Sequence, residues 1–215
     1  MIEGGERPFG IVLAGGQARR MGGGAKPLLT LPGGGPLIDD ILARIAPQCS
    51  GMAISTGSRD PRWKAYPYPR IADAGTSSSG PLAGVLAALD WLEENRPEVR
   101  WLLSVPGDTP FLPRDLVLRL TAALHGGGAE IACADSEGRV HPVVALWSCQ
   151  IREDLRRSLA AGEYRVRDFQ SRFTVTTAVW DNEPVDPFFN INTPKDLKTA
   201  EELIRDHPSL RLSES

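Results

Sequence analysis

The amino-acid sequence predicts an α/β fold, a three-layer α/β/α sandwich built around a Rossmann-like, mostly parallel sheet. Short apolar runs alternate with segments of helical periodicity, which is the pattern of repeated βαβ units. The first run, at 11–14, is apolar throughout and suits a strand buried on both faces, as strands of parallel sheets are. With 215 residues and 41% hydrophobic content the chain can bury one substantial core. We therefore expect a single domain over 1–207 and a frayed tail at 208–215.

Strands are expected where a short apolar run is bounded by turn residues. The expected strands cover residues 11–14, 52–55, 101–105, 130–134, 142–147 and 174–179. The strand at 101–105 is followed by Pro106, Gly107 and Asp108, so Asp108 would stand at the carboxyl end of a buried strand.

Helices are expected where apolar residues recur at helical spacing. The expected helices cover 37–45, the segment that follows Ser79, 116–124 and about 194–206. The helix after Ser79 is the best defined, because Pro81 suits a first helical turn and apolar residues repeat behind it. The glycines at 126–128 would close the helix before them.

The first strand ends abruptly in Gly15 and Gly16, which let the backbone turn sharply and leave its N–H groups open to a close ligand. Arg19, Arg20 and Lys26 follow in a stretch without acidic residues, although the whole chain has a formal net charge of −3. A concavity of N–H groups surrounded by positive charges attracts phosphate oxygens. The loop is therefore predicted to bind a small polyanion.

The spacing within this loop excludes two common phosphate-binding motifs. No GKS or GKT follows Gly16 before Lys26, so the loop is not a Walker motif, and the GxGxxG dinucleotide fingerprint does not fit either. The alternative that stays open is a basic, glycine-rich surface loop without a ligand.

Composition excludes several classes of protein. The N-terminal residues are polar, and no apolar run is long enough to span a bilayer, so a cytoplasmic protein without membrane contact is expected. The three cysteines are widely spaced and predict neither a disulfide framework nor a zinc site. A slightly acidic chain without a basic tract is not expected to bind nucleic acid.

Asp108 and the glycine loop should lie at the same edge of the sheet, because each follows the carboxyl end of a strand. Ligands of open α/β sheets bind at that edge, so the two motifs should face each other. The alternative for Asp108 is a turn carboxylate that accepts from the amides after Pro110.

Four segments form a set of motifs along the chain: the loop with LAGG at 13–16, RMG at 20–22 and Lys26, then GPLAG at 80–84, PGDTP at 106–110 and NINTP at 190–194. Together they resemble the molybdenum cofactor guanylyltransferases, within the superfamily of nucleotide-diphospho-sugar-type nucleotidyltransferases. They occur in the family's order from about Phe9 to Leu203, nearly the whole chain. The resemblance implies transfer of GMP from GTP to molybdopterin carrying molybdenum, with release of pyrophosphate.

The resemblance also implies roles for residues in the nucleotide site. Backbone groups of Leu13, Ala14, Gly15 and Gly16 would contact the nucleotide, and Asp73 would bind its base or ribose. In the family a side-chain amide commonly stands near the end of the second strand. Ser55 would take its place here.

The acceptor site is implied in the same way. Arg19, Gly22 and Arg165 would bind the acceptor, with Arg165 in a segment, 162–166, that resembles one before a short helix in relatives. The alternative for Arg165 is a solvated surface arginine. Arg20 would act beside Lys26 in catalysis.

Both substrates are heavily anionic, so the chemistry requires neutralisation and orientation of charge at the α-phosphorus. Lys26, a compact point charge, could stabilise the pentavalent transition state and the departing pyrophosphate. Mg²⁺ takes one or two carboxylates together with phosphates and waters, and Asp108 is the candidate carboxylate. A phosphate nucleophile is already ionised at neutral pH, so no general base is required, and His141 is expected to shape a loop.

Asn190 and Asn192 stand two apart, so in an extended segment their side chains share a face and could reach the acceptor or the metal. The alternative is local, because Thr193, Pro194 and Asp196 resemble a helix N-terminus that the asparagines would merely support.

Three functional readings remain. The guanine assignment depends on Gly15, because cytidylyl relatives tend to carry alanine there. A cytidylyltransferase, or a nucleotidyltransferase with another acceptor, is the second reading. The third is a non-catalytic module that carries the cofactor or transiently contacts molybdoenzymes or their chaperones, against which the presence of both Lys26 and Asp108 argues.

Overall fold

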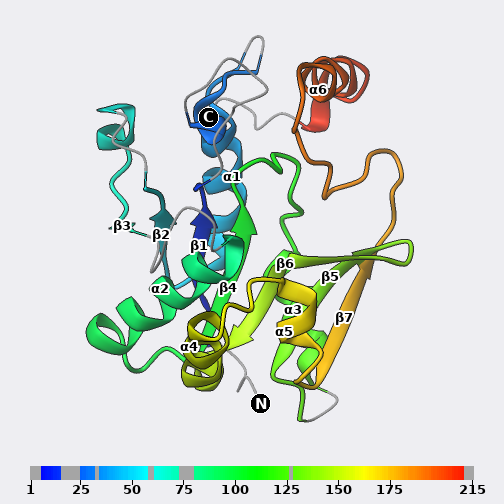
Figure 1. Ribbon diagram of the computed structural model, residues 1–215. Helices are drawn as coiled ribbons and strands as arrows, with labels where there is room; N and C mark the ends of the chain where they lie inside the picture. The colour runs from blue at the N-terminus through cyan, green and yellow to red at the C-terminus, as the bar shows by residue number, and fades with distance from the viewer. Residues whose placement is uncertain are drawn as a thin grey trace.

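A computed structural model of the chain describes residues 6–15, 25–31, 34–57, 61–72, 80–125 and 128–210. Its centre is a seven-stranded sheet in the order β3-β2-β1-β4-β6-β5-β7 (Figure 1). The strands are β1 (Phe9–Leu13), β2 (Gly51–Ser55), β3 (Arg70–Ile71), β4 (Trp101–Pro106), β5 (Ile131–Ser136), β6 (Arg139–Ser148) and β7 (Val175–Trp180). The mostly parallel α/β fold predicted from the sequence is thus confirmed.

One strand runs against the others. β6 pairs antiparallel with both β4 and β5, whereas the other pairings are parallel. Only Glu137 and Gly138 connect β5 to β6, both with positive φ, and Asp135 accepts a hydrogen bond from the Gly138 amide at 2.7 Å. A link of two residues cannot cross over to a parallel neighbour, so β6 has to return beside β5.

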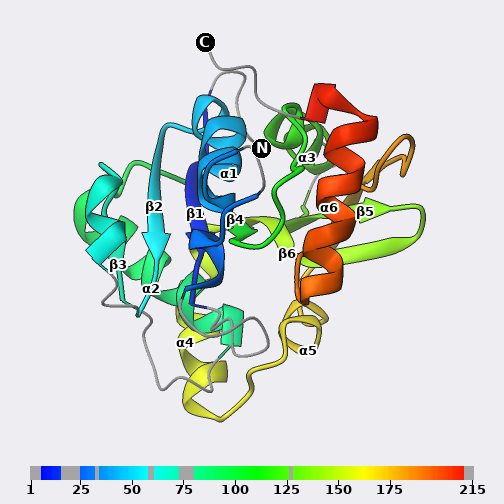
Figure 2. The ribbon, with the colours of Figure 1, turned by 90° about the horizontal axis from the view of Figure 1, so that it is seen from above.

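Helices cover both faces of the sheet (Figure 2). The helices are α1 (Leu37–Ile45), α2 (Gly80–Asn95), α3 (Leu116–Leu124), α4 (Arg152–Ala160), α5 (Val166–Gln170) and α6 (Pro194–Asp206). α1 and α3 pack on one face, in the cluster that contains Val12 and Leu103, and α2, α4 and α5 pack on the other, with Ile11 and Leu102. This arrangement is the predicted three-layer sandwich.

α6 belongs to neither layer. Its Ala200 and Ile204 pack in a small third cluster with Leu31, Phe111 and Ile191, beyond the edge where the parallel strands end (Figure 1). The N-terminus of α6 is thereby brought toward that edge.

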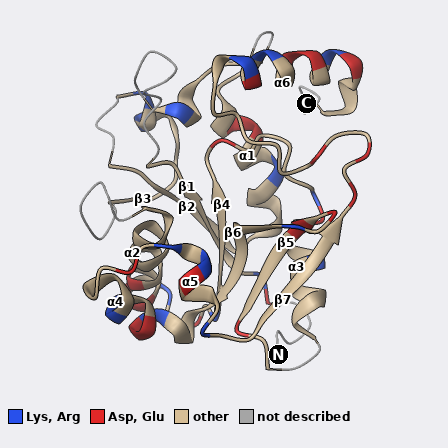
Figure 3. Cartoon of the chain, turned by 45° about the vertical axis from the view of Figure 1, so that its right-hand side comes forward, with Lys and Arg blue, Asp and Glu red and all other residues tan. Residues whose placement is uncertain are grey.

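The helices α1, α3 and α6 begin and end where the sequence predicts them. α4 was not predicted, since it carries charges of both signs and buries only Leu155 and Ser158 (Figure 3). The short β3 was not predicted either, because it is only two residues long.

The first three residues of the segment expected to be a frayed tail are ordered. Residues Pro208–Leu210 form a 3₁₀ turn, and the buried Arg44 donates hydrogen bonds to the carbonyl oxygens of Leu210 and of Leu112. Residues 208–210 are therefore fixed to α1 and are not frayed, and 211–215 lie outside the described residues. Among the helices that the structure describes, none is both long and apolar enough to cross a membrane.

The packing of α3 predicts a large difference between two leucines two positions apart. Leu120 is 0% exposed and Leu118 is 71% exposed. Truncation of Leu120 leaves a cavity, so Leu120→Ala should lower the free energy of unfolding by about 2–5 kcal/mol. The matched change Leu118→Ala should alter it by less than about 0.5 kcal/mol. Urea unfolding of the two variants measures both values, and equal effects would contradict the described orientation of α3.

Candidate functional site

Three neighbouring strands end together at one edge of the sheet. Leu13 of β1 stands in register with Ser55 of β2 and with Pro106 of β4. Beyond the strands, the Ala14 amide donates to the carbonyl oxygen of Ser55 at 2.8 Å, and the Gly107 amide donates to that of Leu13 at 3.0 Å. The first residues of the glycine loop and the segment of Asp108 therefore face each other, as predicted.

Lys26 lies at the centre of this edge. It opens a 3₁₀ turn, Lys26–Leu28, and is only 8% exposed. Its Nζ lies 2.6 Å from Oδ2 of Asp108 and 2.6 Å from Oδ1 of Asn192. These partners are 82 and 166 residues away in the chain, so the fold gathers three of the four motif segments at one ammonium group.

Gly107 is the residue that allows this approach. A Cβ atom at Gly107 would lie 2.6 Å from Cγ of Pro27 and 3.2 Å from the carbonyl oxygen of Leu13. Because a proline ring and a backbone oxygen cannot move aside easily, only glycine lets the end of β4 contact the turn that carries Lys26.

The 190–192 segment is tied to the end of β4 at two points. The buried Thr109 donates its hydroxyl proton to Oδ1 of Asn190, and the Ile191 amide donates to the carbonyl oxygen of Asp108 at 2.9 Å. Asn190 therefore anchors the segment, whereas Asn192 reaches Lys26. Sequence reasoning did not single out Thr109, since nothing near it in the chain indicates that its partner lies at Asn190.

The N-terminus of α6 fixes Asn192. Oδ2 of Asp196 accepts from the amides of Asn192 and Thr193 at 2.9 and 2.8 Å, and the Thr193 hydroxyl accepts from the Asp196 amide, which completes a capping box. The cap predicted from the sequence is thus confirmed, and it also places Asn192 beside Lys26. A role of the two asparagines toward the acceptor or the metal stays a prediction.

The charge of Asp196 is stabilised in the folded chain. Desolvation by burial raises its pKa, but the hydrogen bonds from the Asn192 amide and from Thr193, together with the charge of Lys26, outweigh that effect and lower the pKa below its ordinary value of 3.8.

The alternative role for Asp108, a carboxylate bonded to the amides after Pro110, does not match its contacts. Within the described ranges its Oδ2 accepts from Lys26, and its Oδ1 lies 3.4 Å from the Thr109 hydroxyl, whose proton goes to Asn190. Its side chain remains 21% exposed, so it is not fully enclosed by the fold.

The donor atoms suit a hard cation. Oxygen atoms of Asp108 and Asn192 meet at the Lys26 ammonium, and both are of the kind that Mg²⁺ prefers. In the part of the chain that the structure describes, no group of three or more His, Cys, Asp or Glu could hold a metal ion. A cation at Asp108 could complete its shell with waters and with oxygens of a bound ligand.

The other predicted site residues divide into two groups. Leu13, Ala14, Gly15 and the 1%-exposed Ser55 lie at the strand ends described above. Gly16, Arg19, Arg20, Gly22 and Asp73 lie outside the described residues.

Arg165 lies beside α5 and is not part of the contacts that join Lys26, Asp108 and Asn192. Its side chain is 88% exposed, and its guanidinium lies 4.0 Å from the carboxylate of Asp168 in α5. The segment that carries it does approach α2, because the carbonyl oxygen of Tyr164 lies 3.8 Å from where a Cβ of Gly80 would stand. Gly80 has φ +63, so the GPLAG motif begins on a backbone that favours glycine.

His141 has the structural role expected of it. It is buried, its Nε2 lies 2.7 Å from the Ser136 hydroxyl, and its ring centroid lies 4.6 Å from that of Phe188. Burial is the main cause that lowers its pKa below the ordinary histidine value.

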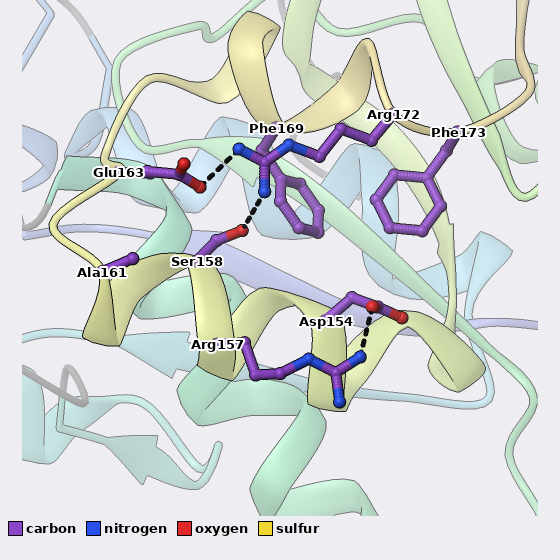
Figure 4. Close-up of a pocket in the computed structure, with 8 residues that line it drawn as sticks. All are labelled: Asp154, Arg157, Ser158, Ala161, Glu163, Phe169, Arg172 and Phe173. Carbon is purple, nitrogen blue, oxygen red and sulfur yellow. Dashed lines mark hydrogen bonds and ion pairs between the residues drawn. The ribbon is translucent and has the colours of Figure 1, made fainter.

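Two cavities lie away from this edge. One of about 350 Å³ opens between α4 and α5, where Arg172 donates to Ser158 and Glu163, and Arg157 pairs with Asp154 (Figure 4). The other, of about 520 Å³, lies beside Trp101 at the opposite ends of the strands. The charges around the first cavity are paired with one another, and neither cavity is lined by Lys26 or Asp108.

The sequence of this chain is similar to those of known nucleotidyltransferases. The family model described as the MobA-like NTP transferase domain matches residues 10–176. The molybdenum cofactor guanylyltransferase of Rhodopseudomonas palustris strain HaA2 is 50% identical over 202 residues, 94% of this chain and 94% of that protein. The enzyme of the same name from Mesorhizobium japonicum is 44% identical over 200 residues, 91% of this chain and 95% of its own.

Solved structures share the fold. The molybdopterin-guanine dinucleotide biosynthesis protein A of Archaeoglobus fulgidus has a TM-score of 0.70 at 23% identity, over 92% of this chain and 99% of that one. The CMP:2-keto-3-deoxy-manno-octonic acid synthetase, in complex with CTP, has a TM-score of 0.67 at 13% identity, over 94% and 99% of the two chains. This chain therefore has the nucleotidyltransferase fold.

The close contact at Gly107 predicts an effect on stability. Gly107→Ala should lower the free energy of unfolding by about 1–3 kcal/mol, because the added methyl group overlaps Pro27. Gly57→Ala is the matched control, since nothing lies within 4 Å of its Cβ position. Urea unfolding gives both values, and a Gly107→Ala protein as stable as the control would contradict the contact.

The lowered pKa of Asp196 predicts a pH-dependent contribution to stability. Asp196→Asn should cost about 0.3–1 kcal/mol at pH 7, where the native carboxylate is charged at the helix N-terminus. A lowered folded pKa means that this stability is fully present above the ordinary value of 3.8 and is lost as the pH falls from there through the lower pKa of the folded state. Urea unfolding should therefore show a larger difference at pH 7 than at pH 3. The exposed Glu202, in the middle of α6, gives a Glu202→Gln control that should show none.

Proposed function

Because this chain belongs to the MobA-like NTP transferase family, we propose that it is a molybdenum cofactor guanylyltransferase, which transfers GMP from GTP to molybdopterin carrying molybdenum. The chain is a nucleotidyltransferase, and its relatives of this name match it over nine tenths or more of its length. The observation that carries the mechanism is the 2.6 Å contact of Lys26 with Asp108, at the edge where the glycine loop begins.

The reaction needs charge neutralisation more than proton transfer. An oxygen of the acceptor's phosphate attacks the α-phosphorus of GTP, the bond to the bridging oxygen between the α- and β-phosphorus breaks, and pyrophosphate leaves with the electron pair of that bond. The attacking phosphate is already ionised at neutral pH, so no side chain has to remove a proton. This agrees with the position of His141, which is buried beside Ser136 and Phe188.

Lys26 supplies the positive charge at this edge. Its ammonium is nearly buried, and a charge that is shielded from water stabilises developing negative charge more strongly than an exposed one. We assign it to the triphosphate, where it would stabilise the transition state and the pyrophosphate that leaves. Arg20 is proposed to act beside it.

Family members of this kind use a divalent metal, and we propose Mg²⁺, held by Asp108. A metal bound there would draw negative charge from the phosphate oxygens and orient them. One protein carboxylate is sufficient for Mg²⁺ when phosphates and waters complete the shell.

The remaining assignments follow the family pattern. We propose that Leu13, Ala14, Gly15 and Gly16 contact the nucleotide through their backbone, and that Ser55 and Asp73 contribute to its base or ribose site. The residues proposed for the acceptor are Arg19, Gly22, Arg165, Asn190 and Asn192. These segments would act as parts of one nucleotidyltransferase domain over 1–207.

The test is pyrophosphate release from each of the four nucleoside triphosphates, in the presence of Mg²⁺ and molybdopterin carrying molybdenum. Release with GTP is expected, and Asp108→Ala or Lys26→Ala should reduce turnover by about 10²-fold or more. Asp206→Ala removes an exposed carboxylate from the opposite end of α6 and should leave turnover unchanged.

Each other outcome has a definite meaning. Release with CTP in place of GTP would make the chain a cytidylyltransferase. Release from no nucleotide would refute the proposed reaction and favour another acceptor or a non-catalytic module. Full activity in Asp108→Ala would remove Asp108 from the metal site.

A further inference from the structure

The ammonium group of Lys26 occupies one carboxylate oxygen of Asp108 and the amide oxygen of Asn192, two oxygens that a divalent cation could use. Nζ lies 2.6 Å from the Asp108 carboxylate and 2.6 Å from the Asn192 amide oxygen. The mechanism, however, needs Asp108 for the metal and Lys26 for the triphosphate. The arrangement without ligands is therefore not the one that carries out the reaction.

Charge prevents both cations from using Asp108 together. The side chains of Lys26 and Asp108 are only 10% and 21% exposed, so water and salt screen this region weakly. A divalent cation that approaches Asp108 meets a positive charge already in hydrogen-bond contact with the carboxylate. Lys26 has to leave before the metal can bind well.

The side chain can move without its backbone. Pro27 is packed against Gly107, which fixes the turn Lys26–Leu28, while the side chain of lysine is a flexible four-carbon chain. A bound triphosphate offers several anionic oxygens as new partners for the ammonium. Asp196, whose charge interacts with that of Lys26, favours the position of the ammonium beside Asn192 when no nucleotide is present.

We propose that the ammonium group of Lys26 blocks metal binding at Asp108 until the phosphates of a bound triphosphate attract this ammonium away from the carboxylate. The proposal rests on the function assigned above, in which Asp108 holds the metal. Each ligand then removes the obstacle to the other, and because linkage is reciprocal, nucleotide and metal raise one another's affinity. The protein would bind the metal–nucleotide complex and exclude metal alone, which leaves Asp108 paired in the resting state.

The test measures Mn²⁺ binding to the full chain without nucleotide or acceptor, by the loss of the free-ion signal in electron paramagnetic resonance. Lys26→Met should bind Mn²⁺ about tenfold more tightly than the native chain, although it loses turnover. Lys195→Met removes an equal charge from an exposed residue in the first turn of α6 and should stay within about twofold of native. Mn²⁺ affinity in Lys26→Met within twofold of native would overturn the proposal.

A second measurement uses the native chain, so it decides the matter even if Lys26→Met does not fold. The reaction of Lys26 with an amine-directed reagent, followed by mass spectrometry of the peptides, should become several-fold faster at saturating Mn²⁺. Bound Mn²⁺ with an unchanged rate at Lys26 would contradict displacement. Because neither measurement uses GTP, failure of the blocking role is distinguishable from failure of the proposed reaction, which pyrophosphate release tests.

Discussion

A nearly buried ammonium group must have oxygen partners, and the structure at the strand ends is organised to give them to Lys26. The parallel register of β1 and β4 places Asp108 beside Lys26. The capping box at the N-terminus of α6 places Asn192 there. The missing side chain of Gly107 lets the two sheet segments approach each other. Remote parts of the chain thus meet at one nitrogen atom.

The sheet and α6 make different contributions to this site. The sheet has two large apolar clusters that hold its strand ends rigidly, whereas α6 is attached through a small third cluster. The contacts of Thr109 with Asn190 and of Asp108 with Ile191 join these two parts where the apolar packing is thinnest. Polar contacts of fixed geometry therefore set the position of Asn192 more than burial does.

Local signals explain what the sequence could predict. The helices at 37–45, 116–124 and 194–206 have apolar spacing and end signals that a short window contains, and their limits agree with the structure. The direction of β6 depends on a two-residue turn, and α4 has no apolar stripe, so neither was found. The motifs indicated Lys26 and Asp108, but their contact and the role of Thr109 depend on segments that only the fold brings together.

The contact between Lys26 and Asn192 has a consequence for how the chain reaches its working form. It spans 166 residues of a chain of 215, so the loop that it closes includes almost the entire sheet. Closing such a loop costs chain entropy, and the contacts that offset this cost form only after the intervening strands have paired. During synthesis, the lysine gains its amide partner only after Asn192 has been made. Assembly of the site is therefore among the last events in folding. A ribosome-bound chain in which the first parallel strands have already paired does not yet have a complete site.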